Sequence, residues 1–345
     1  MQRLRIIFCS YLAAGICWSS LGMPLAAAQE RVFIVGSGSN VPVHLYQAWT
    51  TEFNKKNSNV QVQYLALGTS ESIKQTGEGI GDFGGGEVPL TDEQAQGSKV
   101  TMRLIPTAVV GIVPIYNLPG NPELNFSGDL LGQIYLGTVK NWKDPRIAKL
   151  NPDAALPDLP ITVVHRSDGK GSNYILTDFL SKTNSRFRDE VGRSPSPKWP
   201  LGVEANRGED MVERVASTRG AVGYVELNFA RNAGIGYGRV ENASGHFVRA
   251  TPASIEAACA ALETSLSDDF RTRLTNAPGN DSYPIASFTW IYVPTSSASP
   301  ARRTALKQFL SWSLQEGQEV AKNMEFAPLP ERVAAKAQEA VNSLK

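Results

Sequence analysis

The sequence predicts an α/β protein with two domains, in which strands alternate with helices. Apolar, β-branched runs alternate along the chain with segments of helical spacing, and this alternation is typical of layered α/β folds. The 345 residues are 42% hydrophobic, which is enough for two hydrophobic cores. Three of the expected strands run into a loop rich in Gly, Ser or Thr and then into a helix. Such junctions are typical of a site built from helix N-termini, which bind anions.

Residues 1–28 have the features of a secretory signal peptide. Arg3 and Arg5 precede a mostly apolar run over residues 6–16, and three alanines at 26–28 match a small-residue cleavage site. The apolar run is too short for a membrane-spanning helix. We therefore expect this segment to be removed and the rest of the chain to be secreted.

Charge and cysteine content exclude several classes of function. The net charge is +1 and loses two arginines with the signal peptide, so no basic face for nucleic acid is expected. Cys259 is the one cysteine beyond residues 1–28, which excludes an intramolecular disulfide and a thiolate metal cluster, and its helical setting favours a buried structural thiol. His44, His165 and His246 show no metal-ligand spacing. We expect neither a metal nor a cofactor.

The first junction follows an apolar strand over residues 31–35. This strand runs into GSGSN, which ends at Asn40, and Pro42 suits the first turn of a helix, so Asn40 is expected to be the N-cap. Apolar side chains then recur every four residues and predict the buried face of the helix: Leu45, Trp49 and Phe53.

The second junction follows a half-buried strand, in which Val60, Val62 and Tyr64 alternate with polar residues. The strand ends before Gly68, and Thr69 or Ser70 is expected to cap the next helix. A second interpretation adds a hydroxyl directed at a ligand.

Glu87 follows three consecutive glycines, Gly84 to Gly86, which let the backbone pass close to a neighbour. An exposed surface glutamate is the simpler interpretation. Beside an anion site, this carboxylate would require a ligand that carries a proton to donate to it.

The third junction is the strongest. A strand over residues 161–164 breaks at Asp168-Gly169-Lys170-Gly171, and apolar spacing then predicts a helix to residue 180. Free backbone N–H groups of the turn, flanked by Arg166 and Lys170 and joined by the Ser172 hydroxyl, favour an anion. We predict that this turn forms half of an oxyanion site.

Two long apolar runs, at residues 105–116 and 285–293, are predicted to cross between the domains. GAVGYVE at residues 220–226 predicts a tight turn into a buried strand. Residues 301–323 and 331–344 have helical composition and spacing.

The chain resembles the periplasmic phosphate-binding proteins of the Pst ABC transporters over nearly its whole length after the signal peptide. The similar stretches are GxGxxxPxxxYxxW from Gly36 to Trp49, Gly68-Thr69, DFGGGEVPLTDE, IYLGTVKNWKDPRIAKLNP, HRSDGKGSN, KWPLG and GAVGYVE. The resemblance implies a type II periplasmic-binding-protein fold, with two α/β domains, two hinge strands and a ligand cleft between them. It implies a discontinuous domain I, residues 29–108 plus 290–345, and a domain II, residues 109–289.

The resemblance also implies which residues hold phosphate. The expected ligands are Asn40, Val41, Thr69, Glu87, Arg166, Lys170, Gly171 and Ser172, and the expected supporting residues are Ser39, Ser70 and Asp168. Asp168 is expected to pair with Arg166. Asn40-Val41 replaces a usual threonine-phenylalanine pair, Lys170 replaces a serine, and Glu87 replaces an aspartate that accepts the ligand's proton.

Glu87 and Lys170 leave two arrangements open. In the first, Glu87 accepts a proton from the ligand and Lys170 strengthens anion binding. In the second, the two side chains pair with each other and leave the pocket nearly neutral there. We expect oxyanion binding in both, because the helix-start donors remain.

The function that the resemblance implies is delivery of inorganic phosphate to an inner-membrane ABC permease and ATPase complex by a monomeric periplasmic protein. Another oxyanion, a phosphate ester, or a secreted phosphate scavenger or sensor without a transporter remain alternatives. A hydrolase with Ser172 or Ser70 as nucleophile is the rival of another class. It is disfavoured because His165 is expected on the opposite face of its strand and no GxSxG motif is present.

Overall fold

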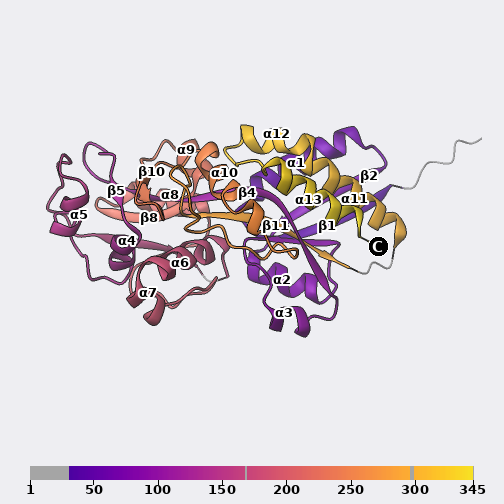
Figure 1. The fold of residues 1–345 in the computed structure, drawn as a ribbon, viewed down its shortest axis with the longest axis horizontal. Coiled ribbons are helices and arrows are strands. Elements are labelled where there is room, and N and C mark those ends of the chain that lie inside the picture. Colours follow the sequence, from indigo (N-terminus) through magenta and orange to yellow (C-terminus); the bar gives the residue numbers. More distant parts are fainter. Residues whose placement is uncertain (1–30, 168, 296–298, 345) are drawn as a thin grey trace, which may run out of the picture. The chain divides into compact units, whose positions relative to one another are not determined.

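A computed structural model describes residues 31–167, 169–295 and 299–344, so the predicted signal peptide lies outside the described residues. In this part of the chain, eight strands form one mixed sheet (Figure 1). Their spatial order is β2 (Val60–Ala66), β1 (Val32–Gly38), β3 (Phe83–Gly86), β11 (Ala286–Pro294), β4 (Met102–Tyr116), β8 (Ala221–Glu226), β6 (Thr162–Arg166) and β7 (Val203–Ala205). A smaller sheet contains β10 (Phe247–Val248), β9 (Arg239–Glu241) and β5 (Asn125–Phe126).

The two longest strands, β4 and β11, form the centre of the large sheet. They are antiparallel, with Met102 opposite Pro294 and Gly111 opposite Ala286, and a bulge lies between Thr289 and Trp290. On one side β1, β2 and β3 run parallel to one another, and on the other side β6, β7 and β8 do. Nearly every residue of β4 and β11 is buried, as their apolar composition predicts. The strands predicted over residues 105–116 and 285–293 are confirmed, whereas their crossing between two domains stays a prediction.

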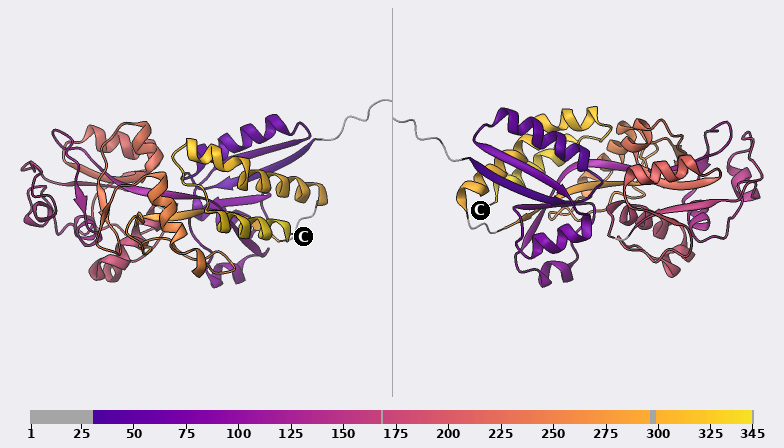
Figure 2. Two further views of the ribbon diagram at one scale, coloured as in Figure 1. Left: turned by 45° about the horizontal axis from the view of Figure 1, so that its top comes forward. Right: turned by 180° about the vertical axis from the view of Figure 1, so that it is seen from behind.

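Helices cover both faces of this sheet. They are α1 (Val43–Lys56), α2 (Thr69–Gly77), α3 (Asp92–Gly97), α4 (Gly128–Tyr135), α5 (Pro145–Leu150), α6 (Gly171–Thr183), α7 (Ser185–Glu190), α8 (Gly208–Ser217), α9 (Leu227–Asn232), α10 (Pro252–Ala260), α11 (Pro300–Leu314), α12 (Glu316–Asn323) and α13 (Glu331–Asn342), with a 3-10 turn at Glu263–Ser265. Over β1 and β2, α1 and α11 lie on one face and α2 on the other (Figure 2). This confirms the predicted layered α/β class.

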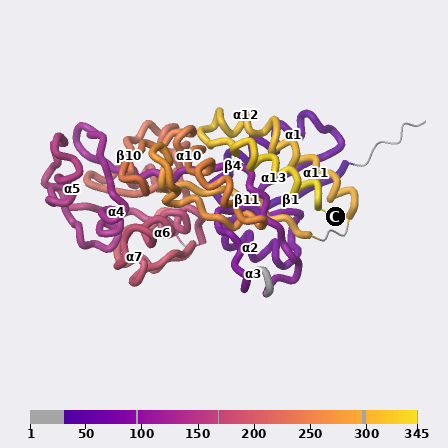
Figure 3. Tube along the Cα trace, viewed as in Figure 1, coloured from indigo at the N-terminus to yellow at the C-terminus, as the bar shows by residue number. Residues whose placement is uncertain are grey.

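The C-terminal helices pack beside the N-terminal segment, as the two ends of the colour scale show (Figure 3). Phe53 of α1 lies 5.4 Å from Phe309 and 5.9 Å from Trp312 of α11, measured between ring centroids. Trp49 Nε1 donates to the carbonyl of Gly317 over 2.7 Å. The apolar residues that recur every four positions along α1 thus contact helices that lie far away in the sequence.

A second aromatic cluster stabilises the other side of β4. Trp142 is fully buried, and its Nε1 donates to the carbonyl of Gly220 over 2.9 Å. Tyr135 packs on Trp199 with ring centroids 5.4 Å apart. Cys259 is buried and free, as predicted. None of the helices over the described residues has the length and apolar character that crossing a bilayer demands.

Candidate functional site

Three helices begin directly after parallel strands of the large sheet. β1 leads into α1, β2 into α2, and β6 into α6. Their N-caps are Pro42, Gly68 and Lys170, and none makes a side-chain capping hydrogen bond. The first N–H groups of a helix have no acceptor within the helix, and the helix dipole adds partial positive charge there. The three junctions therefore present donors that a ligand can use.

The predicted caps of α1 and α2 were wrong. Asn40 lies before the N-cap Pro42 rather than at it, and its buried Oδ1 has no hydrogen-bond partner among the described residues. Thr69 is the first residue of α2, and Gly68 precedes it at φ +101°, where glycine is the residue that fits without strain. Because Thr69 is not the N-cap, its hydroxyl donates to a carboxylate instead.

That carboxylate is Glu87, which lies at the end of β3 and is fully buried. Ser39 Oγ donates to Glu87 Oε2 over 2.6 Å, and Thr69 Oγ1 donates to the same oxygen over 3.2 Å. Glu87 Oε1 has no partner among the described residues. The pKa of Glu87 is raised to about 8, chiefly by burial and also by the nearby charge of Glu226, while the two hydroxyl hydrogen bonds oppose the change. The free oxygen can accept a proton from a ligand.

Gly171, the first residue of α6, lies directly against Glu87. A Cβ built on Gly171 would be 1.8 Å from Glu87 Oε2 and 3.0 Å from Thr69 Oγ1. The absence of a side chain therefore allows the start of α6 to reach the carboxylate. Ser172 is also fully buried, and its Oγ has no partner within the described chain.

The turns before α2 and α6 also contact each other. The N–H of Ser70 donates to the carbonyl of Gly169 over 3.3 Å. A Cβ built on Gly68 would lie 3.9 Å from Lys170 Nζ. Glu87 and the β1–α1 and β2–α2 junctions belong to the part of the sheet on one side of the central strands β4 and β11, and the β6–α6 turn belongs to the part on the other side. The two parts thus come together at this point.

Arg166 ends β6 and is 1% exposed, which is rare for a guanidinium without strong partners. Its Nη2 donates to the carbonyl of Asn206 over 3.2 Å, whereas Nε and Nη1 have no hydrogen-bond partner among the described residues. Its backbone N–H donates to the hydroxyl of Tyr224 over 2.9 Å, which fixes the end of the strand. Two buried, cationic N–H directions therefore remain for an anion.

Val41 and Ser70 are placed differently from the prediction, and a third predicted residue is not described. The N–H of Val41 donates to Ser39 Oγ over 3.0 Å, and its side chain belongs to the core. Ser70 is exposed and uses its N–H in the contact with Gly169. Asp168, the predicted partner of Arg166, lies outside the described residues.

Lys170 is half-buried at the edge of this group. Burial lowers the pKa of its ammonium, as does the neighbouring Arg166, whereas Glu204 opposes the change. The ion pairs within 4 Å in the described part of the chain do not include one between Lys170 and Glu87. The second arrangement, in which the two side chains pair, is therefore not found among the described residues, and the first, in which Glu87 accepts from a ligand, stays a prediction.

Sequence reasoning missed Glu226, the acid beside Arg166. Glu226 ends β8, is 1% exposed, and places Oε1 3.6 Å from Arg166 Nη1. The signal was present in GAVGYVE, because an acid directly after a buried parallel strand lies at the carboxyl edge of the sheet, where ligands of α/β proteins bind. Tyr224, two residues earlier, was missed for the same reason.

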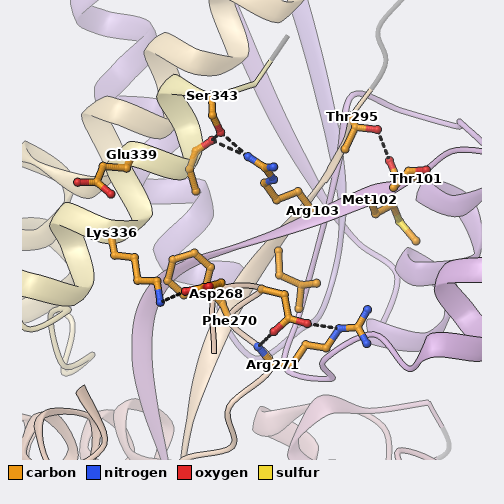
Figure 4. A pocket seen from close by; sticks show the side chains of 13 residues that line it. Thr101, Met102, Arg103, Asp268, Phe270, Arg271, Thr295, Lys336, Glu339 and Ser343 are labelled. Carbon is orange, nitrogen blue, oxygen red and sulfur yellow. Dashed lines mark hydrogen bonds and ion pairs between the residues drawn. The ribbon is translucent and has the colours of Figure 1, made fainter. Parts of the chain in front are cut away.

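An open pocket of about 570 Å³ lies elsewhere, between α13, the N-terminal end of β4 and the loop before β11 (Figure 4). Its polar side chains contact one another: Lys336 Nζ donates to Asp268 over 2.9 Å, and Arg103 donates to Ser343. Because these charges are satisfied locally, the pocket offers a ligand less than the buried, unpartnered groups around Arg166 do. In the described residues, no group of His, Cys, Asp and Glu has the arrangement of a metal site.

Comparison with known proteins assigns the family. A model of the PBP superfamily domain matches residues 25–316. The phosphate-binding protein PstS of Xylella fastidiosa is 32% identical over 311 residues, covering 89% of this chain and 84% of the relative, and PstS of Pasteurella multocida is 32% identical and covers 91% of each. A crystal structure from Clostridium perfringens, of a substrate-binding protein assigned to a phosphate ABC transporter and with bound phosphate, has a TM-score of 0.63 at 19% identity, covering 86% of this chain and all of that one. The fold is therefore the type II periplasmic-binding-protein fold, and the chain belongs to the PstS family of phosphate-binding proteins within the PBP superfamily.

Proposed function

We propose that this chain is the substrate-binding component of an ABC transporter and that it binds inorganic phosphate where β3, α2, β6 and α6 meet. One observation carries the proposal: this group of junctions holds buried donors and a buried acceptor that have no hydrogen-bond partner among the described residues. The donors are Arg166 Nε and Nη1 and Ser172 Oγ, and the acceptor is Glu87 Oε1. Buried polar groups are nearly always hydrogen-bonded, so this arrangement is completed by a ligand that both accepts and donates.

Phosphate meets this requirement. Near neutral pH it retains at least one proton, since its second ionisation lies near ~6 in a monoester. The protonated oxygen donates to Glu87 Oε1 while the others accept from Arg166, from Ser172 and from the first N–H groups of α6. Sulfate has no proton to donate, so above a pH of about 8, where Glu87 is ionised, it would place an oxygen lone pair against the carboxylate. That contact costs several kcal/mol, which corresponds to roughly a thousandfold in affinity.

We further propose that residues 29–108 plus 290–345 form domain I and residues 109–289 form domain II. Ser39, Thr69 and Glu87 then come from domain I, whereas Arg166 and Gly171 come from domain II. A ligand held by both domains stabilises the closed arrangement, with β4 and β11 as the connections that bend.

The partners and the location follow from the same proposal. The closed protein delivers phosphate to an inner-membrane permease and ATPase complex from the periplasm, after removal of residues 1–28. The PstS relatives support this assignment. A secreted phosphate scavenger or sensor uses the same site without these partners, and a gene neighbourhood that encodes a permease and an ATPase distinguishes the two.

The geometry gives little support to the hydrolase alternative. The ring of His165 stacks on Trp199 with centroids 5.5 Å apart, and its Nδ1 lies 3.1 Å from the carbonyl oxygen of Arg166. A nucleophilic Ser172 requires a base within hydrogen-bond reach of its Oγ, and that oxygen has no partner among the described residues.

Calorimetric titration of the chain without residues 1–28 tests the proposal. Phosphate and arsenate, which both carry a proton near neutral pH, are expected to bind, and sulfate to bind at least a hundredfold more weakly, in line with the cost of an unmatched buried charge. A phosphate ester titrated in parallel tests the alternative ligand class. If none of these anions produces heat or raises the thermal unfolding temperature, the proposal is wrong.

A further inference from the structure

Glu226 is a buried acid that the proposed phosphate contacts do not use. Its side chain is 1% exposed, and neither carboxylate oxygen has a hydrogen-bond partner among the described residues. Arg166 Nη1 lies 3.6 Å from Glu226 Oε1, which is an ion pair but is longer than a hydrogen bond. Both residues end neighbouring parallel strands, β8 and β6, so the sheet itself places the carboxylate beside the guanidinium.

Three other charged groups influence the pKa of Glu226. Arg166 lowers the pKa of Glu226 against the larger effect of burial, which raises it, while Glu209 raises it and His44 lowers it. His44 and Glu209 are about half exposed and lie 3.4 Å from each other, so solvent screens them. Glu226 in turn raises the pKa of Glu87. The buried charges that influence one another are therefore Arg166, Glu226 and Glu87.

We propose that Glu226 determines the specificity of the anion site by holding the Arg166 guanidinium and balancing its charge. The site then favours an oxyanion that can carry a proton over one that is always dianionic. This inference rests on the proposed binding of phosphate and names a residue that sets its selectivity.

The expected effect of Glu226 is electrostatic. A second buried carboxylate reduces the positive potential around Arg166, and the reduction disfavours a ligand with two negative charges more than a ligand with one. Phosphate can lower its charge from two to one by binding a second proton, whereas sulfate cannot. Glu87 discriminates between the anions by direct contact with the ligand's proton. Glu226 adds an energetic penalty that depends on the total charge of the ligand.

Glu226→Gln tests the proposal, because it removes the charge and keeps the shape. Glu213→Gln is the matched control, since Glu213 is an exposed residue of α8 and loses the same charge. Phosphate and sulfate are titrated into wild type and both variants at one pH by calorimetry. We expect Glu226→Gln to lower the ratio of phosphate affinity to sulfate affinity by about tenfold or more, the lower end of what a neighbouring charge does to a buried group. Glu213→Gln should leave the ratio unchanged.

A merely structural role predicts another result. If Glu226 only supports the fold around Arg166, the substitution weakens both anions by the same factor and the ratio stays within about threefold of wild type, which overturns the proposal. Glu226→Asp, which keeps the charge, is expected to restore the preference, and a ratio as low as that of Glu226→Gln would also overturn it. Should Glu226→Gln not fold, Glu226→Met removes the charge without adding an amide that needs partners. A wild-type chain that binds no phosphate refutes the proposed function itself.

Discussion

Gly171 provides the sharpest test of the geometry, because a single methyl group at this position has nowhere to go. A Cβ on Gly171 would lie 1.8 Å from Glu87 Oε2 and 2.8 Å from Glu87 Cδ. Glu87 is buried and held by Ser39 and Thr69, so it cannot swing into solvent. In Gly171→Ala, the start of α6 and the end of β3 must therefore move apart by more than about 1 Å to reach a normal contact.

A displacement of this size moves the donors of α6 away from the acceptor on β3. Misplacement by about 1 Å commonly costs about a hundredfold, so we expect phosphate affinity to fall by about that factor. This corresponds to about 2.7 kcal/mol. Because the added methyl group overpacks a buried contact, the ligand-free variant should also lose about 1–3 kcal/mol of stability and unfold at a temperature several degrees lower.

Calorimetric titration with phosphate measures this effect. Gly97→Ala is the matched control, because Gly97 lies in the exposed helix α3 and a Cβ there would meet nothing within 4 Å. The control should bind phosphate as wild type does. A Gly171→Ala variant that retains affinity within about threefold would show that α6 does not approach Glu87 as described.

Three further predictions concern charge and packing. Arg166→Ala should weaken phosphate binding by about 2 kcal/mol or more, as loss of a charged hydrogen-bond partner does, while the exposed Arg207→Ala serves as the control; equal affinities would place the guanidinium outside the site. Burial raises the pKa of Glu87 from 4.5 to about 8, so the proton on Glu87 stabilises the folded chain relative to the unfolded chain. This stabilisation is complete below pH 4.5 and is lost as the pH rises to about 8. The unfolding free energy of the ligand-free chain, from urea titrations, should fall by up to about 1.4 kcal/mol per pH unit across this window and less steeply in Glu87→Gln; parallel slopes would contradict the pKa shift. Phe53→Ala should destabilise the chain to urea by about 3–5 kcal/mol, and a loss below 1 kcal/mol would mean that the contact between α1 and α11 is not part of the core.

Local patterns in the sequence predicted much of the fold. The spacing of Leu45, Trp49 and Phe53 predicted the buried face of α1, and the apolar runs at residues 105–116 and 285–293 predicted the two central strands. These features depend on period and hydrophobicity, which a single segment contains. The strand-to-helix junctions were found for the same reason.

The contacts of the site could be predicted only in part. Asn40 has the chemistry of an N-cap, but the cap is Pro42, and Asn40 Oδ1 has no hydrogen-bond partner among the described residues. GAVGYVE places Glu226 at the end of a buried strand, but its position beside Arg166 depends on β8 pairing with β6 in the sheet. Both cases depend on tertiary placement, which residue type and spacing do not contain.

The packing of Phe53 and Phe83 on Phe309 has a consequence for biosynthesis. A chain emerging from the ribosome exposes the apolar side of its first α/β segment until the last helices have been made. Contacts between such distant segments fold slowly, because the intervening chain must be ordered before they form. The nascent polypeptide therefore cannot complete this aromatic cluster until its last helices have been made, a delay that is compatible with the secretion proposed above.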